Sequence, residues 1–385
     1  MEIRNRQLTM IMDGNFCEYD GNIFSPHMHY DAFAKRFSGH FEKVTIVARA
    51  FPHSQQNGQL VAKKNVQFEK LPTFRGVIKL LTKLPVLAFS IWNAAKNSDI
   101  LLLRLPGNTS IIALIFCIIM GKRFSIEIVA EPRDIYLPSP IRQPIRFIAK
   151  FVHTYFTRLA VKKAQTVRYV TSTFLQTCYP ADITKSFGFS DVYLPSRPVV
   201  SLEHKNCDEL IIINVAMMHN ISKGHHTLLD ALEIIKNRNI KFTCHLVGDG
   251  VLRTKLKADA EERGISENIQ FHGFSTSVWK ILSTGNVFVL PSYQEGLPRS
   301  ILEAMQLGLP CLSTYVGGIP EILPKEALFK AGDSYQLADK LTRIFQDKDF
   351  YLKLSSFSLE KSLEFTPSSI QKKYDSYLYI LKETS

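Results

Sequence analysis

Short apolar runs alternate with stretches of helical periodicity along the whole chain. The runs predict buried strands, and apolar residues that recur every three or four positions predict helices packed on them. In the first half, strands are expected at 8–12, 44–47, 100–103, 124–129 and 167–171 and helices at 30–36, 78–95 and 111–120. In the second half, strands are expected at 210–215, 242–247, 269–271, 287–290 and 310–313 and helices at 227–236, 252–262, 278–282 and 299–307. This alternation predicts an α/β protein with parallel, doubly wound sheets.

The pattern lapses into polar sequence with Pro and Ser around residues 194–206, where we expect a linker. A chain of 385 residues is long enough for two domains, each with its own core. We therefore expect one domain over residues 1–195, a second over 205–365 and a terminal helix over 366–385. Ser172, after the strand at 167–171, is a candidate N-cap of the next helix.

Charge is distributed unevenly along the chain. The net charge is +12, and residues 1–200 carry 26 Lys and Arg against 13 Asp and Glu. Such an excess favours an anionic partner. The chain has no zinc-ligand spacing, aromatic RNA-binding pattern or basic tail, so nucleic acid is not expected. Segments 74–83 and 141–158 mix basic residues with Ile, Leu and Phe, a pattern typical of helices on an anionic membrane but also of helices whose apolar side faces the core.

Nothing in the sequence indicates a spanning segment or secretion. The six cysteines form no C-x-x-C pair, which is typical of reduced cysteines in a cytosolic protein. The first residues, M-E-I-R-N-R, lack the apolar stretch of a signal peptide. The strongest apolar run, 110–120, is too short to span a bilayer and is expected to form a buried helix. We therefore expect a cytoplasmic protein that is peripheral on the inner face of the cell membrane.

An apolar run at 287–290 leads through P-S-Y-Q-E-G-L-P into a helix that begins at Arg299. In an α/β sheet this junction lies at the carboxyl edge, where ligands bind, and a helix N-terminus favours an anion such as a diphosphate. Glu303, set back in the helix, suits two adjacent hydroxyls of a ribose. Glu295, at the mouth, suits a sugar hydroxyl or developing positive charge. The alternative roles are a buried cap partner for Glu303 and a solvated turn residue for Glu295.

These residues, together with V-G-G-I-P-E at 316–321, G-D-G at 248–250 and K-G at 223–224, resemble the E-x7-E region of the GT4 family of retaining glycosyltransferases. The resemblance implies a GT-B fold, in which two Rossmann-like domains face each other across the cleft that holds the active site. It also implies a nucleoside-diphosphate sugar as donor, retention of anomeric configuration, and no metal or other cofactor. A terminal helix that crosses back to the first domain is a further implication.

The resemblance assigns Lys223 to the leaving diphosphate, because breaking a sugar–phosphate bond leaves negative charge that needs a fixed cation. A solvated loop lysine is the alternative. The remaining residues assigned to the nucleotide sugar in the second domain are Gly296, Leu297, Pro298, Ser300, Gly248 and Phe274.

One expected cation is missing. The family usually has an arginine five residues before the lysine, and this position is Met218 here. Methionine cannot bind phosphate, so either catalysis is lost or another cation substitutes. Arg299, at the helix start between the two glutamates, is the natural substitute, and His219 is a weaker one. Arg299 could instead pair with a nearby acid. The catalytic candidates are thus Glu295, Lys223 and Arg299.

The first domain departs further from the family pattern. In place of the usual glycine-rich loop after the first strand, the chain offers Gly21, whose missing side chain would allow close approach of a ligand. Where many members have a histidine near the transferred sugar, Glu131 or Asp134 is expected to take the position.

The sequence therefore predicts a retaining glycosyltransferase that acts on a glycan acceptor in cell-surface polysaccharide biosynthesis. The basic N-terminal half favours a lipid-linked acceptor. A nucleotide-sugar epimerase of related fold and a catalytically inactive nucleotide-sugar-binding subunit are the alternatives. A dinucleotide oxidoreductase is not expected, because no G-x-G-x-x-G follows the first strand.

Overall fold

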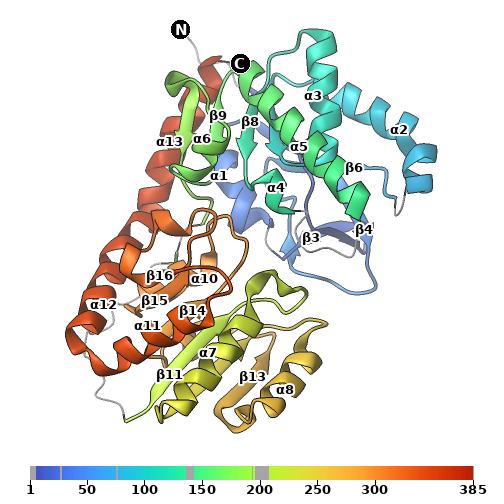
Figure 1. The fold of residues 1–385 in the computed structure, drawn as a ribbon. Coiled ribbons are helices and arrows are strands. Elements are labelled where there is room, and N and C mark those ends of the chain that lie inside the picture. The colour runs from blue at the N-terminus through green and yellow to red at the C-terminus, as the bar shows by residue number, and fades with distance from the viewer. Residues whose placement is uncertain are drawn as a thin grey trace.

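The computed structural model describes residues 6–26, 28–74, 77–135, 143–192, 194–195 and 208–384, with backbone alone at 77–81, 134–135 and 143–146. Its strands form two separate sheets, one within residues 7–188 and the other within 210–329. Helices cover both sheets (Figure 1). The predicted α/β fold with two parallel-sheet domains is confirmed.

The first sheet has the order β10-β9-β8-β7-β1-β4-β2-β3-β5, with β6 also paired to β4. Its strands are β1 (Gln7–Ile11), β2 (Phe16–Tyr19), β3 (Asn22–Ser25), β4 (Lys43–Pro52), β5 (Gln59–Leu60), β6 (Val66–Leu71), β7 (Ile100–Leu105), β8 (Ser125–Ile128), β9 (Val167–Tyr169) and β10 (Ser186–Gly188). The pairs among β1, β4, β6, β7, β8, β9 and β10 are parallel.

A β-hairpin, β2–β3, departs from the expected parallel sheet. Its turn residues Asp20 and Gly21 both have positive φ, 46° and 69°, as the commonest two-residue hairpin turns require. The apolar run 8–12 and the helix at 30–36 were predicted, but the short strands between them carry too few apolar residues to be recognised from periodicity.

The second sheet is parallel throughout, in the order β13-β12-β11-β14-β15-β16. Its strands are β11 (Leu210–Val215), β12 (Phe242–Val247), β13 (Ile269–Gly273), β14 (Val287–Leu290), β15 (Cys311–Thr314) and β16 (Leu328–Phe329). The order changes direction between β11 and β14, and their carboxyl ends are therefore the place where a parallel sheet binds ligands.

The helices lie on the faces of the sheets (Figure 1). In the first domain they are α1 (Lys35–Ser38), α2 (Val77–Lys96), α3 (Asn108–Met120), α4 (Pro132–Ile135), α5 (Gln143–Lys163) and α6 (Phe174–Cys178), with short turns η1 (Tyr30–Ala34) and η2 (Ile183–Lys185). In the second they are α7 (His225–Asn237), α8 (Arg253–Glu262), α9 (Val278–Leu282), α10 (Arg299–Gln306), α11 (Ser334–Gln346) and α12 (Lys348–Ser362), with η3 (Ile221–Lys223), η4 (Ser266–Asn268), η5 (Ile319–Glu321), η6 (Lys325–Ala327) and η7 (Leu363–Phe365).

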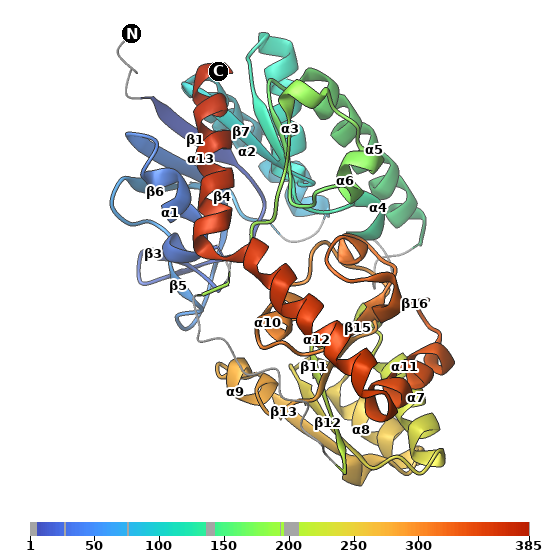
Figure 2. The same cartoon turned by 90° about the vertical axis from the view of Figure 1, so that its left-hand side faces the viewer.

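The last helix, α13 (Pro367–Thr384), leaves α12 and runs along the first domain (Figure 2). Its Tyr374 lies against Phe37 and Phe189, and the Tyr374 hydroxyl donates to Asp191 at 2.6 Å. Burial alone would raise the pKa of Asp191, but the guanidinium groups of Arg104, Arg168 and Arg36 hold it well below its usual value. A buried charge cluster thus fixes the terminal helix to the first domain.

Two local expectations were wrong. Helix α3 was expected to be buried, but one of its sides is exposed, with Ile119 67% accessible. Ser172 does not cap α6, whose N-cap residue is Thr173 without a side-chain cap of its own. The carboxylate of Glu321, from the second domain, accepts instead from the backbone N–H groups of Ser172, Thr173 and Phe174. Sequence-local rules cannot find a cap supplied from so far along the chain.

Within the described residues, no helix is both long and apolar enough to cross a membrane.

Candidate functional site

The loop between β14 and α10 carries Glu295 to the carboxyl edge of the second sheet, and the first turns of α10 carry Glu303 there. Helix α10 begins after Pro298, whose φ of −74° and ψ of 120° are extended, and no side chain caps its first turn. The first N–H groups of a helix have no partner within it, so this end of α10 can bind an anion.

The V-G-G turn packs directly against this loop. Gly317 has φ +57°, and a Cβ there would lie 1.8 Å from the carbonyl oxygen of Glu295. The N–H of Gly318 donates to the carbonyl of Gly296 at 2.7 Å. Only glycine fits at 317, and the turn therefore fixes the backbone that carries Glu295.

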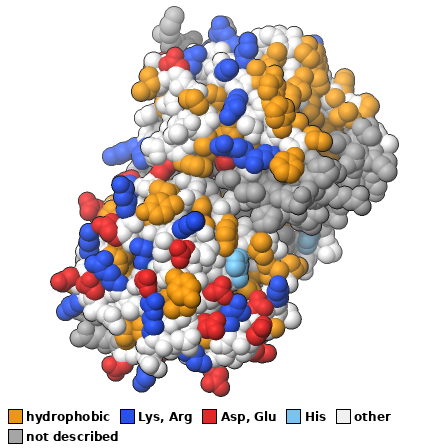
Figure 3. Space-filling model, in the orientation of Figure 1, with side chains coloured by type: hydrophobic (Ala, Val, Ile, Leu, Met, Phe, Trp, Pro, Cys, Tyr) orange, Lys and Arg blue, Asp and Glu red, His pale blue; other side chains and the backbone are white. Residues whose placement is uncertain are grey.

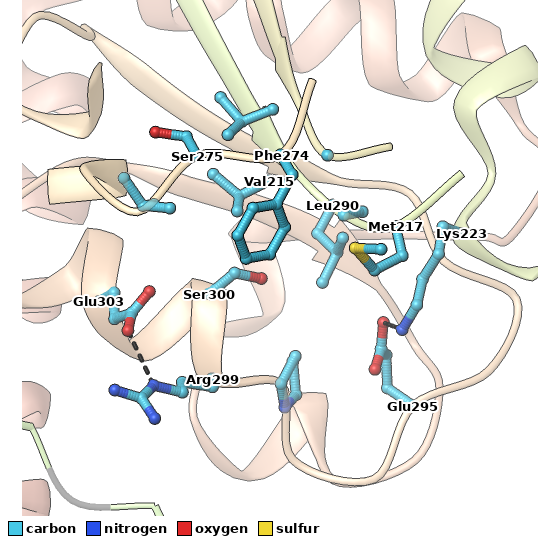
Figure 4. Close-up of a pocket in the computed structure, with 15 residues that line it drawn as sticks. Val215, Met217, Lys223, Phe274, Ser275, Leu290, Glu295, Arg299, Ser300 and Glu303 are labelled. Carbon is cyan, nitrogen blue, oxygen red and sulfur yellow. Dashed lines mark hydrogen bonds and ion pairs between the residues drawn. The ribbon is translucent and has the colours of Figure 1, made fainter. Parts of the chain in front are cut away.

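A pocket of about 420 Å³ opens at the ends of β11, β12 and β14 and the start of α10 (Figure 4). Its volume lies in the usual range for small-molecule sites. Of the residues predicted from sequence, it is lined by Glu295, Lys223, Arg299, Glu303, Pro298, Ser300, Gly248 and Phe274. Residues from separate motifs, as far apart in the sequence as Lys223 and Glu303, are thus brought together around one cavity.

Sequence reasoning missed the apolar and small residues that complete this pocket. They are Val215, Ala216, Met217, Val247, Ser275, Val278 and Leu290. Several of them end strands β11, β12 and β14, so the usable signal was their place at the carboxyl ends of predicted strands.

Lys223 and Glu295 form an ion pair across the pocket, with 2.7 Å between Nζ and Oε1. The Ser292 hydroxyl donates to the same carboxylate oxygen at 2.7 Å. The Glu295 side chain is 8% exposed, so its charge is largely removed from water. Gly224, with φ +68°, lets this segment approach β14, because a Cβ there would lie 1.9 Å from the Pro291 carbonyl oxygen.

Arg299 and Glu303 form a second pair, with 2.8 Å between Nε and Oε1, one turn apart on α10. The Arg299 side chain is 59% exposed and that of Glu303 25%. Figure 4 shows both pairs on the rim of the pocket, with Phe274 and Leu290 between them. The pocket thus offers two carboxylates and two cations around an apolar floor.

The position of the missing arginine needs correction. Met218 was expected to occupy it, but the Met218 side chain is fully buried and its N–H donates to the Asp249 carbonyl. The neighbouring Met217 lines the pocket and is 41% exposed (Figure 4). Met218 therefore does not face the pocket, and Met217 is the methionine of this loop that does.

The histidines near Lys223 do not supply the missing positive charge. Burial lowers the pKa of His225 to about 4, so its ring is neutral at pH 7. His219 is exposed and does not line the pocket.

Residues predicted in the first domain lie outside the pocket. Gly21 is the turn of the β2–β3 hairpin, with nothing within 4 Å of an added Cβ. Glu131 is buried and accepts from Arg133 and from the Tyr179 hydroxyl. Burial opposes its ionisation, but the Arg133 hydrogen bonds outweigh this and lower the pKa of Glu131. The Asp134 side chain lies outside the described residues.

Gly296 and Leu297 lie in the same loop but do not line the pocket. A Cβ at Gly296 would lie 3.7 Å from the Val129 carbonyl oxygen, just after β8 of the first domain. The loop 291–298, called here the donor-side loop because the sequence predicts the donor site there, therefore faces the first domain at close range. In the part of the chain that the structure describes, no group of three or more His, Cys, Asp or Glu could hold a metal ion.

Comparisons with known proteins match the second domain alone in some cases and nearly the whole chain in others. Residues 203–360 match the family model "Glycosyl transferases group 1". Protein CapJ of Staphylococcus aureus is 25% identical over 351 residues, 89% of this chain and 88% of that protein. The amylovoran biosynthesis glycosyltransferase AmsK of Erwinia amylovora is 30% identical over 148 residues, 36% of each chain.

The fold also has solved counterparts. The crystal structure of Anabaena HepE in complex with UDP and glucose superposes with a TM-score of 0.69 over 97% of this chain and 99% of that one, at 16% identity. At this identity the likeness concerns the fold. The chain therefore has the GT-B fold, and its residues 203–360 form a glycosyl transferases group 1 domain.

Proposed function

We propose that the chain is a retaining glycosyltransferase of the GT4 type, which moves a sugar from a nucleoside diphosphate to a hydroxyl of a growing glycan. The observation that carries the proposal is the convergence of Lys223, Arg299, Glu295 and Glu303 on one pocket at an uncapped helix start. A nucleoside diphosphate needs an anion site, a ribose acceptor and an apolar slot for its base. The pocket offers each of these.

The diphosphate lies at the start of α10, between Lys223 and Arg299, and Glu303 accepts from the ribose hydroxyls. The base packs among Phe274, Val278 and Val215. Both cations approach oxygens on which negative charge develops as the sugar–phosphate bond breaks, which lowers the barrier electrostatically. No metal is needed for this arrangement.

Glu295 faces the sugar. Its ion pair with Lys223 and its bond from Ser292 disfavour its use as a free nucleophile. Retention then proceeds by front-face attack, in which the leaving phosphate oxygen takes the proton of the acceptor hydroxyl. The first domain supplies the acceptor side, where Glu131 and Gly21 remain predicted contacts.

The acceptor is proposed to be a saccharide on a lipid carrier, in the synthesis of a cell-surface polysaccharide, by a protein peripheral on the membrane. AmsK, a relative, is named as a glycosyltransferase of amylovoran biosynthesis. HepE, a neighbour in fold, is described in complex with UDP and glucose. The basic excess of residues 1–200 is the feature of this chain that favours an acceptor at an anionic surface.

A catalytically inactive binding subunit is the second candidate, because neither Met218 nor the pocket-lining Met217 can bind phosphate as the arginine implied by the resemblance would. Thermal unfolding with UDP, GDP and ADP tests binding, because a ligand at a hundredfold its Kd stabilises the native state by about 2.7 kcal/mol. Labelled nucleotide sugars with membrane extract then separate the functions. Acceptor-dependent transfer supports the proposal, free epimer indicates an epimerase, and binding without turnover indicates the inactive subunit.

A further inference from the structure

Helix α5 presents aromatic side chains to solvent. Phe147, Phe151 and Tyr155 follow each other at intervals of four residues, and Phe151 is 72% exposed. Further along the same stripe stand Arg158 and Lys162, both exposed. The sequence left open whether the apolar side of this segment faces the core, and the structure places these side chains outside.

Helices α2 and α3 extend this apolar surface. Helix α3 packs against both α2 and α5, and Trp92 of α2 contacts Phe116 of α3 with 5.3 Å between ring centroids. Ile118 and Ile119 of α3 are exposed, and so are Val86 and Phe89 of α2. Large contiguous apolar patches are rare on monomeric proteins and mark interaction surfaces.

The charge of these helices is of one sign. Together α2, α3 and α5 contain eight Lys and Arg and no Asp or Glu. Figure 3 shows hydrophobic side chains gathered over the domain that holds α3 and α5, whereas acidic and basic side chains mix over the second domain. Basic residues beside an exposed apolar face are the pattern of a surface that lies on anionic lipid.

We propose that the outer faces of α2, α3 and α5, called here the lipid-facing surface, dock on a bilayer that contains anionic lipid. The aromatic and Ile side chains enter the boundary between headgroups and acyl chains. Lys and Arg lie along them, with their charged ends at the phosphates. A peptide, or a groove on an acidic partner protein, would match the positive charge of these helices. Neither would cover an apolar surface that extends over three helices.

One helix of the lipid-facing surface also lies near the donor-side loop. Helix α5 packs against α4, and α4 follows β8 closely in the chain. Val129, just after β8, faces Gly296 of the donor-side loop. A carrier lipid in the docked membrane therefore delivers its headgroup at the acceptor side, an arrangement that rests on the proposed function.

The test is sedimentation of the full chain with phosphatidylcholine vesicles, with and without phosphatidylglycerol. We expect binding only with the anionic lipid, weakened by salt because charges are screened over about 8 Å at physiological ionic strength. Phe151→Glu should lower the partition coefficient by at least about tenfold, the scale of removing one aromatic side chain from an apolar phase. Ile183→Glu is the matched control, because Ile183 is 88% exposed on the same domain but outside the three helices.

Equal losses in both variants, or no binding of the unmodified chain at low salt, would overturn the proposal. A dimer in light scattering that Phe151→Glu dissociates, without vesicle binding, would identify a second copy as the occupant instead. The assay requires no turnover. A nucleotide-induced shift in melting temperature reports separately on the donor pocket, so failure of docking and failure of the proposed function are distinguishable.

Discussion

Glu303 is the residue whose role is most directly testable. Its carboxylate accepts from Arg299, and binding the ribose hydroxyls requires it to exchange that partner. Glu303→Gln should weaken donor binding by about 1 to 3 kcal/mol, the scale of a hydrogen bond to a charged group. Calorimetry with the nucleotide identified by thermal shift measures this. Glu267→Gln, an exposed carboxylate elsewhere in the domain, is the control, and an unchanged affinity for Glu303→Gln contradicts the assignment.

Lys223 is expected to stabilise the leaving diphosphate, since it points into the pocket and is fixed by Glu295. Lys223→Ala should lower turnover by about 10² or more, as for loss of one fixed electrostatic donor. Steady-state kinetics with saturating donor measure the effect, with Lys241→Ala, an exposed lysine before β12, as control. Near-normal turnover of Lys223→Ala would mean that the ion pair between Lys223 and Glu295 has a structural role only.

Arg299 distinguishes a substituted active site from an inactive one. If it binds the donor phosphates, Arg299→Ala should cost as much turnover as Lys223→Ala, again about 10². If it serves only as the partner of Glu303, its loss frees that carboxylate and leaves turnover and donor affinity unchanged. Kinetics and calorimetry on this one variant separate the two outcomes.

Among the elements, the loop after β11 gives a new prediction, because the structure turns Met217 rather than Met218 to the pocket. Met217→Arg should fold normally, because the side chain is 41% exposed and lines the pocket. It should also restore part of the turnover lost in Arg299→Ala. Met218→Arg should destabilise by more than about 3 kcal/mol, because it buries an unpaired charge. Denaturant unfolding of the two variants measures the difference in stability. Equal stability would contradict the placement of Met217 in the pocket and Met218 in the core.

Strands β11, β12 and β14 have the bounds predicted from their apolar runs, and the helix after β14 begins at Arg299 as expected. The apolar runs suffice there because most residues of these strands are apolar and buried. They were insufficient for β2, β3 and β5, which are short and partly exposed, and for α3, whose apolar outer side imitates a core helix. The motif residues of the second domain that line the pocket were named from the family resemblance, and their place after strand ends agrees with it. Met217 was missed because an apolar side chain in a pocket resembles one in the core.

For the whole molecule, the relation between the domains depends on Glu321. This residue ends the V-G-G-I-P-E motif, whose glycines support the donor-side loop, and its carboxylate caps α6 of the first domain. The Thr173 hydroxyl donates to it as well, at 3.1 Å. One short segment therefore links the pocket of the second domain to the first domain, and moving the two domains apart there requires these bonds to break.

Glu321→Ala should lower kcat by about tenfold or more, while the donor Kd changes by less than about twofold, because the pocket that binds the donor is lined by the second domain. Loss of the cap should also cost about 1 kcal/mol of stability. Calorimetry for donor binding and steady-state kinetics with acceptor measure the two effects. Glu326→Ala is the control, since Glu326 is a carboxylate of the same domain that pairs with Lys353. A parallel loss of donor affinity would show that Glu321 supports the donor loop within its own domain rather than the alignment of the two domains.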